Sequence, residues 1–322
     1  MERKKKRVLV CGATGFIGRN TVERLARRDD LEVVAVHNRR PPFALDGVRW
    51  VKADLTRAED VNRVVEGMDA IVHAAATTSG AKDILTRPYI HVTDNAVMTS
   101  LLFRAAYEYS VPQLFFFSCT IMYQSGETPV KETDFDPSDD LYPNYFGAGW
   151  TKIYLEKMCE FYARFGRTSF TIARHSNIYG AYDKYDLERS HVFGATVTKV
   201  MTAKDGRIVV WGAGEESRDL LHVDDLVDFV ELALDRQKAP VGLYNVGAGT
   251  VVAIKDLVAK IVAISGRDLA IEHDLSKPSI KTSLCLDCGR AKQDLGWAPR
   301  IGLDEGIART IAWWRENVTP AA

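Results

Sequence analysis

The stretch Val8–Asn20, VLVCGATGFIGRN, decides the fold of this 322-residue chain. Its apolar start, Val8–Cys11, predicts a buried strand, and an amphipathic segment opens behind the stretch. Between them Gly12, Gly15 and Gly18 follow at G-x-x-G-x-x-G spacing. The first glycine permits a tight turn, the second lets a pyrophosphate approach the backbone, and the third lets the helix pack on the strand. Free N–H groups of the first helical turn then face the anion, so the stretch predicts a dinucleotide site.

Strand-like and helix-like segments alternate along the first half of the chain. The predicted strands are Val8–Cys11, Glu32–Val36, Arg49–Lys52, Ala70–His73, Gln113–Phe117 and Ser169–Ala173. The predicted helices are Asn20–Arg28, Ala58–Glu66, Ala96–Tyr109 and Ala148–Phe165. This alternation is typical of a doubly wound α/β fold, in which helices cover both faces of a parallel sheet. We therefore expect a Rossmann-type dinucleotide-binding domain over residues 1–175.

The second half of the chain is less regular. It has a strand-like IVVWG at residues 208–212, predicted helices at Val223–Leu234 and Ile254–Ser265, and a predicted strand at Leu243–Val246. We expect residues 176–322 to form mainly a smaller substrate-binding lobe, with the strand near 243–246 returning to the first sheet. No Gly/Ser linker separates the halves, so the two parts should pack closely around a cleft.

Composition and charge argue against several classes of protein. The 42 basic and 43 acidic residues nearly cancel, so net charge implies no nucleic-acid partner. No stretch has the apolar length of a membrane span, and the MERKKKR start lacks the apolar region of a signal peptide. Five cysteines, an odd number, favour reduced thiols and a cytoplasmic location. Cys285 and Cys288 form a C-x-x-C pair, but no second pair completes a zinc site, and no metal is expected.

The residues after the second predicted strand bear on the choice of cofactor. NAD enzymes usually place Asp or Glu there to hold the ribose hydroxyls, whereas this chain has Asn38, Arg39 and Arg40. Two guanidiniums can hold a 2′-phosphate by bidentate hydrogen bonds, which favours NADP over NAD. The alternative is that both arginines are merely solvated. Asp54 is placed to receive an adenine amino group, and the cofactor can lie against the backbone of the small residues Ala74, Ala75 and Ala76.

The motifs of the chain resemble those of the extended short-chain dehydrogenases/reductases, in the nucleotide-sugar epimerase/dehydratase family, over nearly the whole length. Besides GATGFIG and HAAA, the run RHSNIYGAYDKYDLERSHV resembles the N-x-Y-G-P stretch of the family. WGAGEESRDLLHVDDL resembles W-G-x-G-x-x-x-R-D-F-x-x-V-D-D, and LGWAPRIGLDEGI resembles the C-terminal L-G-W-x-P motif. Within the family, DKYDLERSHV and SKPSIKTSLCLD are most similar to the GDP-fucose synthases.

This resemblance implies an NAD(P)-dependent enzyme acting on a hexose or heptose that is linked to a nucleoside diphosphate, with GDP favoured. The implied chemistry is epimerisation and reduction through a 4-keto sugar. A 4,6-dehydratase, a 4-keto reductase without epimerisation and a non-catalytic dinucleotide-binding sensor are the alternatives. The resemblance also implies a homodimer formed through the segments Ala96–Tyr109 and Ala148–Phe165. It adds further cofactor-binding residues: Thr14, Phe16, Ile17, Leu55, Asn95, Lys152 and His175.

Four residues are implied by the resemblance to bind the nucleotide sugar. Arg218 aligns with an arginine that binds the substrate diphosphate, and Lys199 falls at a second basic phosphate position. Asn177 matches the asparagine that contacts the nucleotide sugar, and His191 matches an acid/base of epimerisation. Lys199 as a surface lysine and His191 as a capping or core histidine are the alternatives. The joint presence of Arg218, Lys199 and Asn177 favours an enzyme over a sensor, which has no need of them.

The implied catalytic pair departs from the family pattern. Relatives carry a Tyr-x-x-x-Lys pair on a helix, and the lysine helps to lower the pKa of the tyrosine so that it can exchange a proton with a sugar hydroxyl. Lys152 fills the lysine position, but Ala148 stands where the tyrosine is expected. Ala148 follows Tyr123 by 25 residues, the spacing that relatives show between two tyrosines, so the register is sound.

Three explanations of Ala148 are open. It is an engineered change, or it is natural with Tyr145 as a surrogate one helical turn earlier, or the protein does different chemistry or none. The hydroxyl position is also unusual, because Cys119, between Ser118 and Thr120, occupies the place of the usual Ser or Thr. Cys119 is either a hydrogen-bond partner or acid/base, or a small buried hydrophobe. Ile121 occupies the place of the acid/base cysteine of GDP-fucose synthases.

Overall fold

Seven parallel strands form the central sheet of the protein. The computed structural model describes residues 4–77, 87–126, 128–187, 190–276 and 283–318. The strand order is β10-β6-β5-β4-β1-β2-β3. The strands are β1 (Lys6–Cys11), β2 (Leu31–His37), β3 (Val48–Lys52), β4 (Ala70–His73), β5 (Gln113–Phe117), β6 (Ser169–His175) and β10 (Val241–Val246). The order reverses between β1 and β4, which is where doubly wound folds bind their ligands, outside the carboxyl ends of the strands. The predicted α/β, Rossmann-type fold is confirmed.

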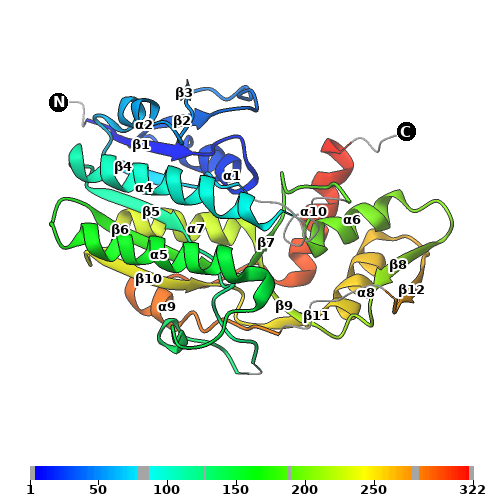
Figure 1. Cartoon of the computed structure of the whole chain (residues 1–322). Helices are drawn as coiled ribbons and strands as arrows, with labels where there is room; N and C mark the ends of the chain where they lie inside the picture. The colour runs from blue at the N-terminus through cyan, green and yellow to red at the C-terminus, as the bar shows by residue number, and fades with distance from the viewer. Residues whose placement is uncertain (1–3, 78–86, 127, 188–189, 277–282, 319–322) are drawn as a thin grey trace.

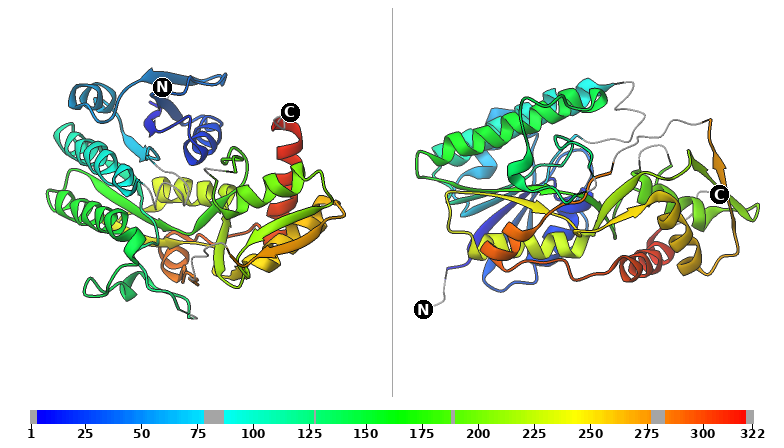
Figure 2. Two further views of the ribbon diagram at one scale, coloured as in Figure 1. Left: turned by 45° about the vertical axis from the view of Figure 1, so that its right-hand side comes forward. Right: turned by 90° about the horizontal axis from the view of Figure 1, so that it is seen from below.

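Both faces of the sheet are buried, as the apolar strands predict. Side chains alternate along β1, so Val8 and Val10 enter one core while Leu9 and Cys11 enter the other. The first core is closed by α1 (Phe16–Leu25), α7 (Val223–Arg236) and α9 (Gly289–Leu295), and the second by α2 (Ala58–Val65), α4 (Thr93–Glu108) and α5 (Phe146–Ala163). The view from below in Figure 2 shows these two helical layers with the sheet between them.

The second lobe is built on short strands. A three-stranded sheet has the order β11-β9-β7, from Val251–Ala253, Ser217–His222 and Asn177–Tyr179, and a two-stranded one pairs β12 (Ala270–Asp274) with β8 (Arg207–Trp211). Around them pack α6 (Val192–Thr202), α8 (Ile254–Ser265) and α10 (Leu303–Asn317) (Figure 1).

The chain crosses between the two lobes more often than a boundary after residue 175 implies. The predicted return of the strand near 243–246 is β10, which pairs with β6. Helices α7 and α9 also return to the central sheet, although they lie beyond residue 175. The segments that leave and re-enter therefore tie the lobes together, and they bring β7 and β9 of the second lobe close to the carboxyl edge of the first.

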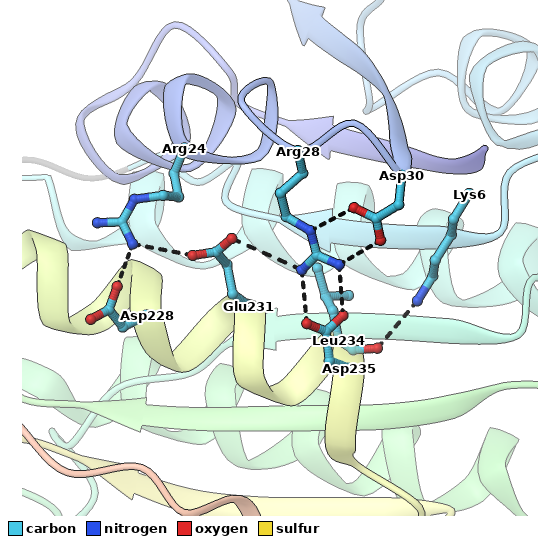
Figure 3. Close-up of polar contacts among 8 residues, drawn as sticks. All are labelled: Lys6, Arg24, Arg28, Asp30, Asp228, Glu231, Leu234 and Asp235. Carbon is cyan, nitrogen blue, oxygen red and sulfur yellow. Dashed lines mark hydrogen bonds and ion pairs between the residues drawn. The ribbon is translucent and has the colours of Figure 1, made fainter.

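Helices α1 and α7, far apart in sequence, are joined by a row of ion pairs (Figure 3). Arg24 of α1 contacts Asp228 and Glu231 of α7, the latter at 3.1 Å. Arg28 reaches Asp235 of α7 at 2.8 Å. All the partners are at least one-fifth exposed, so each pair contributes little alone, and the row acts as a network that fixes the register of the two helices.

Among the described residues, no helix is long and apolar enough to cross a membrane. All five cysteines are free thiols, and Cys11 and Cys159 are buried in the core. Cys288 lies 3.5 Å from the Gly247 carbonyl oxygen. The part of the chain that the structure describes contains no group of three or more His, Cys, Asp or Glu side chains that could hold a metal ion.

Candidate functional site

The glycine loop between β1 and α1 closes tightly on itself. Gly12 has φ +75°, and the N–H of Gly15 donates to its carbonyl oxygen at 2.9 Å. A Cβ on Gly12 would lie 2.6 Å from the backbone of Ala75, and a Cβ on Gly18 would lie 2.1 Å from the Gly12 oxygen. Side chains are therefore excluded at both positions by backbone atoms.

The same loop fits the phosphates of a dinucleotide. Gly15 is the N-cap of α1 and offers no capping side chain, and no acidic residue occupies the first turn. The N–H groups at the start of a helix lack intrahelical partners and favour an anion. Opposite the loop, Ala74 donates its N–H to the Cys11 carbonyl at 3.1 Å, so small residues line both sides. Thr14, Phe16, Ile17 and Ala76 of the predicted set lie in these two segments.

The predicted adenosine-binding residues lie after β2 and β3. Asn38, Arg39 and Arg40 are exposed, and neither guanidinium forms an ion pair with another residue that the structure describes. Asp54 accepts hydrogen bonds from the N–H and hydroxyl of Thr56 at 3.0 and 2.7 Å, and these bonds hold the pKa of its carboxyl below its usual range. The Leu55 side chain is buried in the core, and its contact with a cofactor stays a prediction.

Asn95 of α4 holds the segment that follows β4. Its amide oxygen accepts the Thr77 N–H at 2.8 Å. Its amide nitrogen donates to the carbonyl oxygens of Thr77 and His91 at 3.0 and 2.9 Å. Both amide hydrogens are thus used by backbone, so Asn95 positions the segment after the alanines, and its contact with a cofactor stays a prediction.

Lys152 lies on α5 with its ammonium at the end of β5. Its Nζ donates to the Phe117 carbonyl oxygen at 2.7 Å and lies 4.7 Å above the Phe116 ring. Burial lowers the pKa of this ammonium, and the neighbouring Cys119 and Glu156 act to raise it. Ala148 lies one turn earlier in the first turn of the same helix. The lysine position predicted from sequence therefore faces the carboxyl edge of the sheet.

The three residues after β5 have different environments. The Ser118 hydroxyl is buried and donates to Glu156 at 2.5 Å, and its place among the catalytic residues stays a prediction. Cys119 is a neighbour of Lys152, whose charge lowers the pKa of the thiol, while the larger effect of burial raises it. Thr120 accepts the N–H of Tyr123 through its carbonyl oxygen at 3.0 Å. Of the three side chains, Cys119 is the one whose pKa the Lys152 charge affects.

Tyr145 is the N-cap of α5 and connects the two lobes electrostatically. Its ring centroid lies 5.6 Å from that of Tyr142. Burial raises the pKa of its hydroxyl, the Arg218 guanidinium lowers it, and Cys119 raises it again. Arg218 belongs to β9 of the second lobe. The charges of Lys152 and Cys119, of Cys119 and Tyr145, and of Tyr145 and Arg218 thus influence one another across the two lobes.

The two predicted histidines, His175 and His191, influence each other electrostatically. His175 ends β6, and its Nδ1 lies 2.8 Å from the Ser176 carbonyl oxygen. Burial lowers the pKa of His175 to about 4, and the charges of Lys152 and His191 act in the same direction. His191 is the N-cap residue of α6 and remains exposed to solvent, although the surrounding protein and Lys184 lower its pKa. Its side chain makes no capping bond, so the capping alternative is excluded.

Two of the predicted substrate residues, Arg218 and Lys199, line separate hollows of the second lobe, and Asn177 lines neither of them. Asn177 of β7 donates to the Asp219 carbonyl oxygen at 3.2 Å. Arg218 lines a cavity of about 240 Å³ under β11 and the Pro299–Leu303 segment. Lys199 lines another of about 360 Å³, where its Nζ donates to the Val209 carbonyl oxygen at 2.8 Å. Residues 277–282 of the stretch SKPSIKTSLCLD lie outside the described residues.

Sequence analysis missed Asp219 and Trp211. Asp219 is buried, and its carboxylate accepts N–H groups from Ala248, Gly249 and Leu286 at 2.7, 3.1 and 3.2 Å. It therefore fixes the returning chain beside Arg218. Trp211 is 56% exposed at the end of β8, with the Lys199 ammonium 5.7 Å from its ring. The tryptophan at the end of the apolar run IVVW is the sequence feature that could have pointed to this position.

A pH dependence of stability follows from His73, which is buried at the end of β4. Its Nε2 lies 2.9 Å from the Thr99 hydroxyl, and burial lowers its pKa to about 3. Between pH 6.5 and 3, His73 binds a proton in the unfolded chain but stays neutral in the folded one. The free energy of unfolding therefore falls as pH drops from 6.5 toward 3. We expect His73→Gln to reduce this slope by about 1.4 kcal/mol per pH unit in urea titrations. An unchanged slope would contradict the assignment.

Comparison with known proteins places this geometry in a family. The NAD dependent epimerase/dehydratase family matches residues 8–247. The chain is 29% identical to the GDP-L-fucose synthase of Escherichia coli K12, covering 97% of this chain and 98% of that protein. It is 28% identical to a dTDP-4-dehydro-6-deoxy-D-allose reductase of Streptomyces bikiniensis, with 96% of each covered.

Solved structures share the fold over nearly the whole chain. The UDP-glucose 4-epimerase of Thermotoga maritima has a TM-score of 0.86 at 23% identity, covering 97% of this chain and all of that one. MoeE5, solved with UDP-glucuronic acid and NAD, has a TM-score of 0.83 at 25% identity and similar coverage. The tight glycine loop after β1 and the position of Lys152 at the edge of the sheet are consistent with the family match. The chain belongs to the NAD dependent epimerase/dehydratase family.

Proposed function

We propose that this protein epimerises and reduces a GDP-linked 4-keto hexose or heptose with a nicotinamide cofactor. The observation that carries the proposal is the electrostatic coupling of Lys152 and Cys119, at the edge of the central sheet, with Tyr145 and with Arg218 of the second lobe. A sensor that binds only a dinucleotide has no use for this connection. The GDP-L-fucose synthase of E. coli, similar over the full length, supports the choice of GDP.

The cofactor supplies hydride exchange at C4 of the sugar when it is bound. Gly12, Gly15 and Gly18 hold its diphosphate, and Lys152 lies where it can hold the nicotinamide ribose. The substrate diphosphate is held by Arg218, whose guanidinium stays charged in a partly buried position. Trp211 offers a flat exposed face for the base, with Lys199 beside it.

Epimerisation needs a base and an acid on opposite sides of the sugar ring. A keto group at C4 acidifies the hydrogens at C3 and C5, so a neutral imidazole can remove one of them. His191 is accessible and has a lowered pKa, which makes it neutral near pH 7. The Cys119 thiol is the proton donor available on the cofactor side, because burial keeps it protonated.

Reduction without epimerisation is the second candidate. The dTDP-4-dehydro-6-deoxy-D-allose reductases of two Streptomyces strains are 28% and 29% identical to this chain over nearly its full length. Ile121, not cysteine, stands at the position of the acid/base of GDP-fucose synthases. If Cys119 does not serve in its place, the 4-keto group is reduced and the ring carbons keep their configuration.

A turnover assay in D₂O separates these functions. The protein is mixed with NADPH and a GDP-linked or dTDP-linked 4-keto-6-deoxyhexose, and the absorbance of reduced nicotinamide is followed. We expect the absorbance to fall with the GDP sugar and the product to carry deuterium at C3 or C5. A reduced product without deuterium supports the reductase. Cofactor binding with no nucleotide-sugar binding by calorimetry overturns both and favours a sensor.

The preference for NADP predicts a selective effect of the arginines after β2. We expect the Arg39→Ala/Arg40→Ala variant to weaken NADPH binding about tenfold or more while NADH binding stays the same, because a lost charge-assisted hydrogen bond costs about 1.5–3 kcal/mol. Fluorescence titration measures both constants. Arg57→Ala is the control, since Arg57 is exposed and pairs with Glu59 at 3.7 Å. Equal weakening for both cofactors would argue for NAD as the physiological partner.

We also propose that the protein is a cytoplasmic homodimer that assembles through α4 and α5, which lie side by side in Figure 1. Large apolar side chains are exposed along these helices and at their ends. Tyr154 and Phe161 of α5 are 54% and 51% exposed, Phe146 is 61% exposed, and Val97 of α4 is 39% exposed. Apolar surface at helical spacing on two adjacent helices is what a second copy of the same helices can cover.

Phe161 offers a direct test of this assembly. We expect Phe161→Lys to convert a dimeric mass into a monomeric one in light scattering at micromolar concentration, because a charge at the centre of an apolar interface loses its solvation. Leu275→Lys is the matched control, since Leu275 is 73% exposed in the other lobe. A monomeric wild-type protein would refute the dimer.

A further inference from the structure

A buried ion pair lies directly behind the candidate catalytic residues. Glu156 follows Lys152 by one turn of α5, and Arg174 is the penultimate residue of β6. The guanidinium donates to the carboxylate from Nε at 3.0 Å and from a terminal nitrogen at 2.6 Å. The two side chains are 5% and 4% exposed. A pair so deeply buried needs further partners to offset the loss of hydration.

Those further partners belong to the segment that carries Cys119 and Thr120. At its start, the Phe117 carbonyl oxygen accepts a hydrogen bond from the Lys152 ammonium, and the Ser118 hydroxyl donates one to the Glu156 carboxylate. At its end, the Tyr123 hydroxyl accepts a hydrogen bond from Arg174 at 2.8 Å. Hydrogen bonds to Lys152 and Glu156 at one end, and to Arg174 at the other, therefore hold the segment in place.

The network continues away from the site into the rest of the fold. The Tyr123 hydroxyl donates to the Asn245 side-chain oxygen at 2.7 Å, and the Asn245 backbone N–H donates to Glu132 at 2.7 Å. Asn245 also donates from its side chain to the Val130 carbonyl oxygen at 2.7 Å. The pair is thus anchored to β10 and to the 130–132 segment, so it cannot shift independently of the sheet.

We propose that the Glu156–Arg174 pair is the positioning element of the site: it holds the 117–123 segment against α5 and places a carboxylate one helical turn from Lys152. The inference rests on the proposed function only in that Lys152 and Cys119 are taken as site residues. Neither Glu156 nor Arg174 touches substrate or cofactor. Both act through Lys152 and through the placement of Cys119.

The charges around Lys152 give the proposal a definite sign. Groups from four elements act on the ammonium or feel its charge: His73, Cys119, Glu156, Cys159 and His175. Among them, Glu156 is the carboxylate that raises the pKa of Lys152 against the effect of burial. Arg174 offsets part of that negative charge. Removing Glu156 and removing Arg174 should therefore move the titration of Lys152 in opposite directions.

The test titrates Lys152 by NMR in the full chain with ¹³C-labelled lysine, its signal assigned with Lys152→Arg. We expect Glu156→Gln to lower the midpoint by about one pH unit or more, and Arg174→Gln to raise it. Glu160→Gln, which removes an exposed carboxylate one turn further along α5, should leave the midpoint unchanged. A purely structural role predicts that loosening exposes Lys152, which raises the midpoint in both variants, and that result overturns the proposal.

Ser118→Ala covers the case in which breaking the buried pair prevents folding. The variant keeps the charges of Glu156 and Arg174 and removes only the hydrogen bond between Ser118 and Glu156. The titration midpoint of Lys152 should therefore be unchanged, while the alkylation of Cys119 by iodoacetamide becomes several-fold faster. An unchanged alkylation rate overturns the positioning role. None of these readouts requires turnover, so a protein that fails the nucleotide-sugar assay can still pass this test, and an active enzyme can fail it.

Discussion

The Gly18→Ala variant is expected to lose binding of the nicotinamide cofactor by about 100-fold or more, equivalent to about 2.7 kcal/mol. The added Cβ would lie 2.1 Å from the Gly12 carbonyl oxygen and 2.7 Å from its carbon. Both are backbone atoms of the residue that follows β1, so no flexible side chain can move aside. Helix α1 must instead shift away from the strand, and the loop that holds the diphosphate opens.

NADPH fluorescence titration measures this loss, and circular dichroism with thermal unfolding shows whether the fold survives. Gly302→Ala is a matched control, because Gly302 has φ −64° at the start of α10 and an added Cβ there meets no atom within 4 Å. It should bind the cofactor as the wild type does. A folded Gly18→Ala protein that binds NADPH within about threefold of the wild type would show that this loop does not hold the diphosphate.

The cofactor half of the fold could be predicted from sequence because its signals are local. Gln113–Phe117 and Ala70–His73 are mostly apolar runs of strand length, and both are strands with the predicted bounds. The helix near Asn20 begins four residues earlier, at Phe16, because the glycine loop itself leads directly into the helix. The periodicity of apolar residues indicates which face of a helix is buried, but it does not indicate where the helix begins or ends.

The second lobe could not be predicted in the same way. Strand β7 has three residues, and β9 begins with the polar run Ser217–Asp219. Their pairing is decided by contacts between distant segments: β9 pairs in parallel with β7 and antiparallel with β11. Helix α6 carries three threonines and three valines, whose branched side chains weaken the helical signal.

The candidate site shows the same division. The glycines and Lys152 lie where their motifs predict, because local geometry fixes both. The Ser118 hydroxyl and the Asn95 amide are instead used by Glu156 and by the Thr77 backbone, which sequence spacing cannot reveal. Which of three adjacent polar side chains faces a cleft depends on where the strand stops, and β5 ends at Phe117.

The identity of the general acid/base predicts the second large effect. If Tyr145 replaces the tyrosine missing at Ala148, Tyr145→Phe should lower kcat by about 10²–10⁴-fold with little change in stability. The stability expectation follows because its hydroxyl forms no hydrogen bond with another described residue. Tyr142→Phe is the control: its ring neighbours that of Tyr145 at 5.6 Å, and it is 40% exposed.

Restoring a tyrosine at residue 148 distinguishes the three explanations of Ala148. In the surrogate case, Ala148→Tyr adds little to the wild type but rescues Tyr145→Phe, because residues 145 and 148 both lie at the start of α5, about one helical turn apart. If Ala148 marks an inactivated enzyme, Ala148→Tyr alone raises turnover by about 10²-fold or more, and Tyr145→Phe changes nothing. Absence of turnover in every variant, with nucleotide sugar still bound, leaves chemistry that depends on Cys119 and His191 without a phenol.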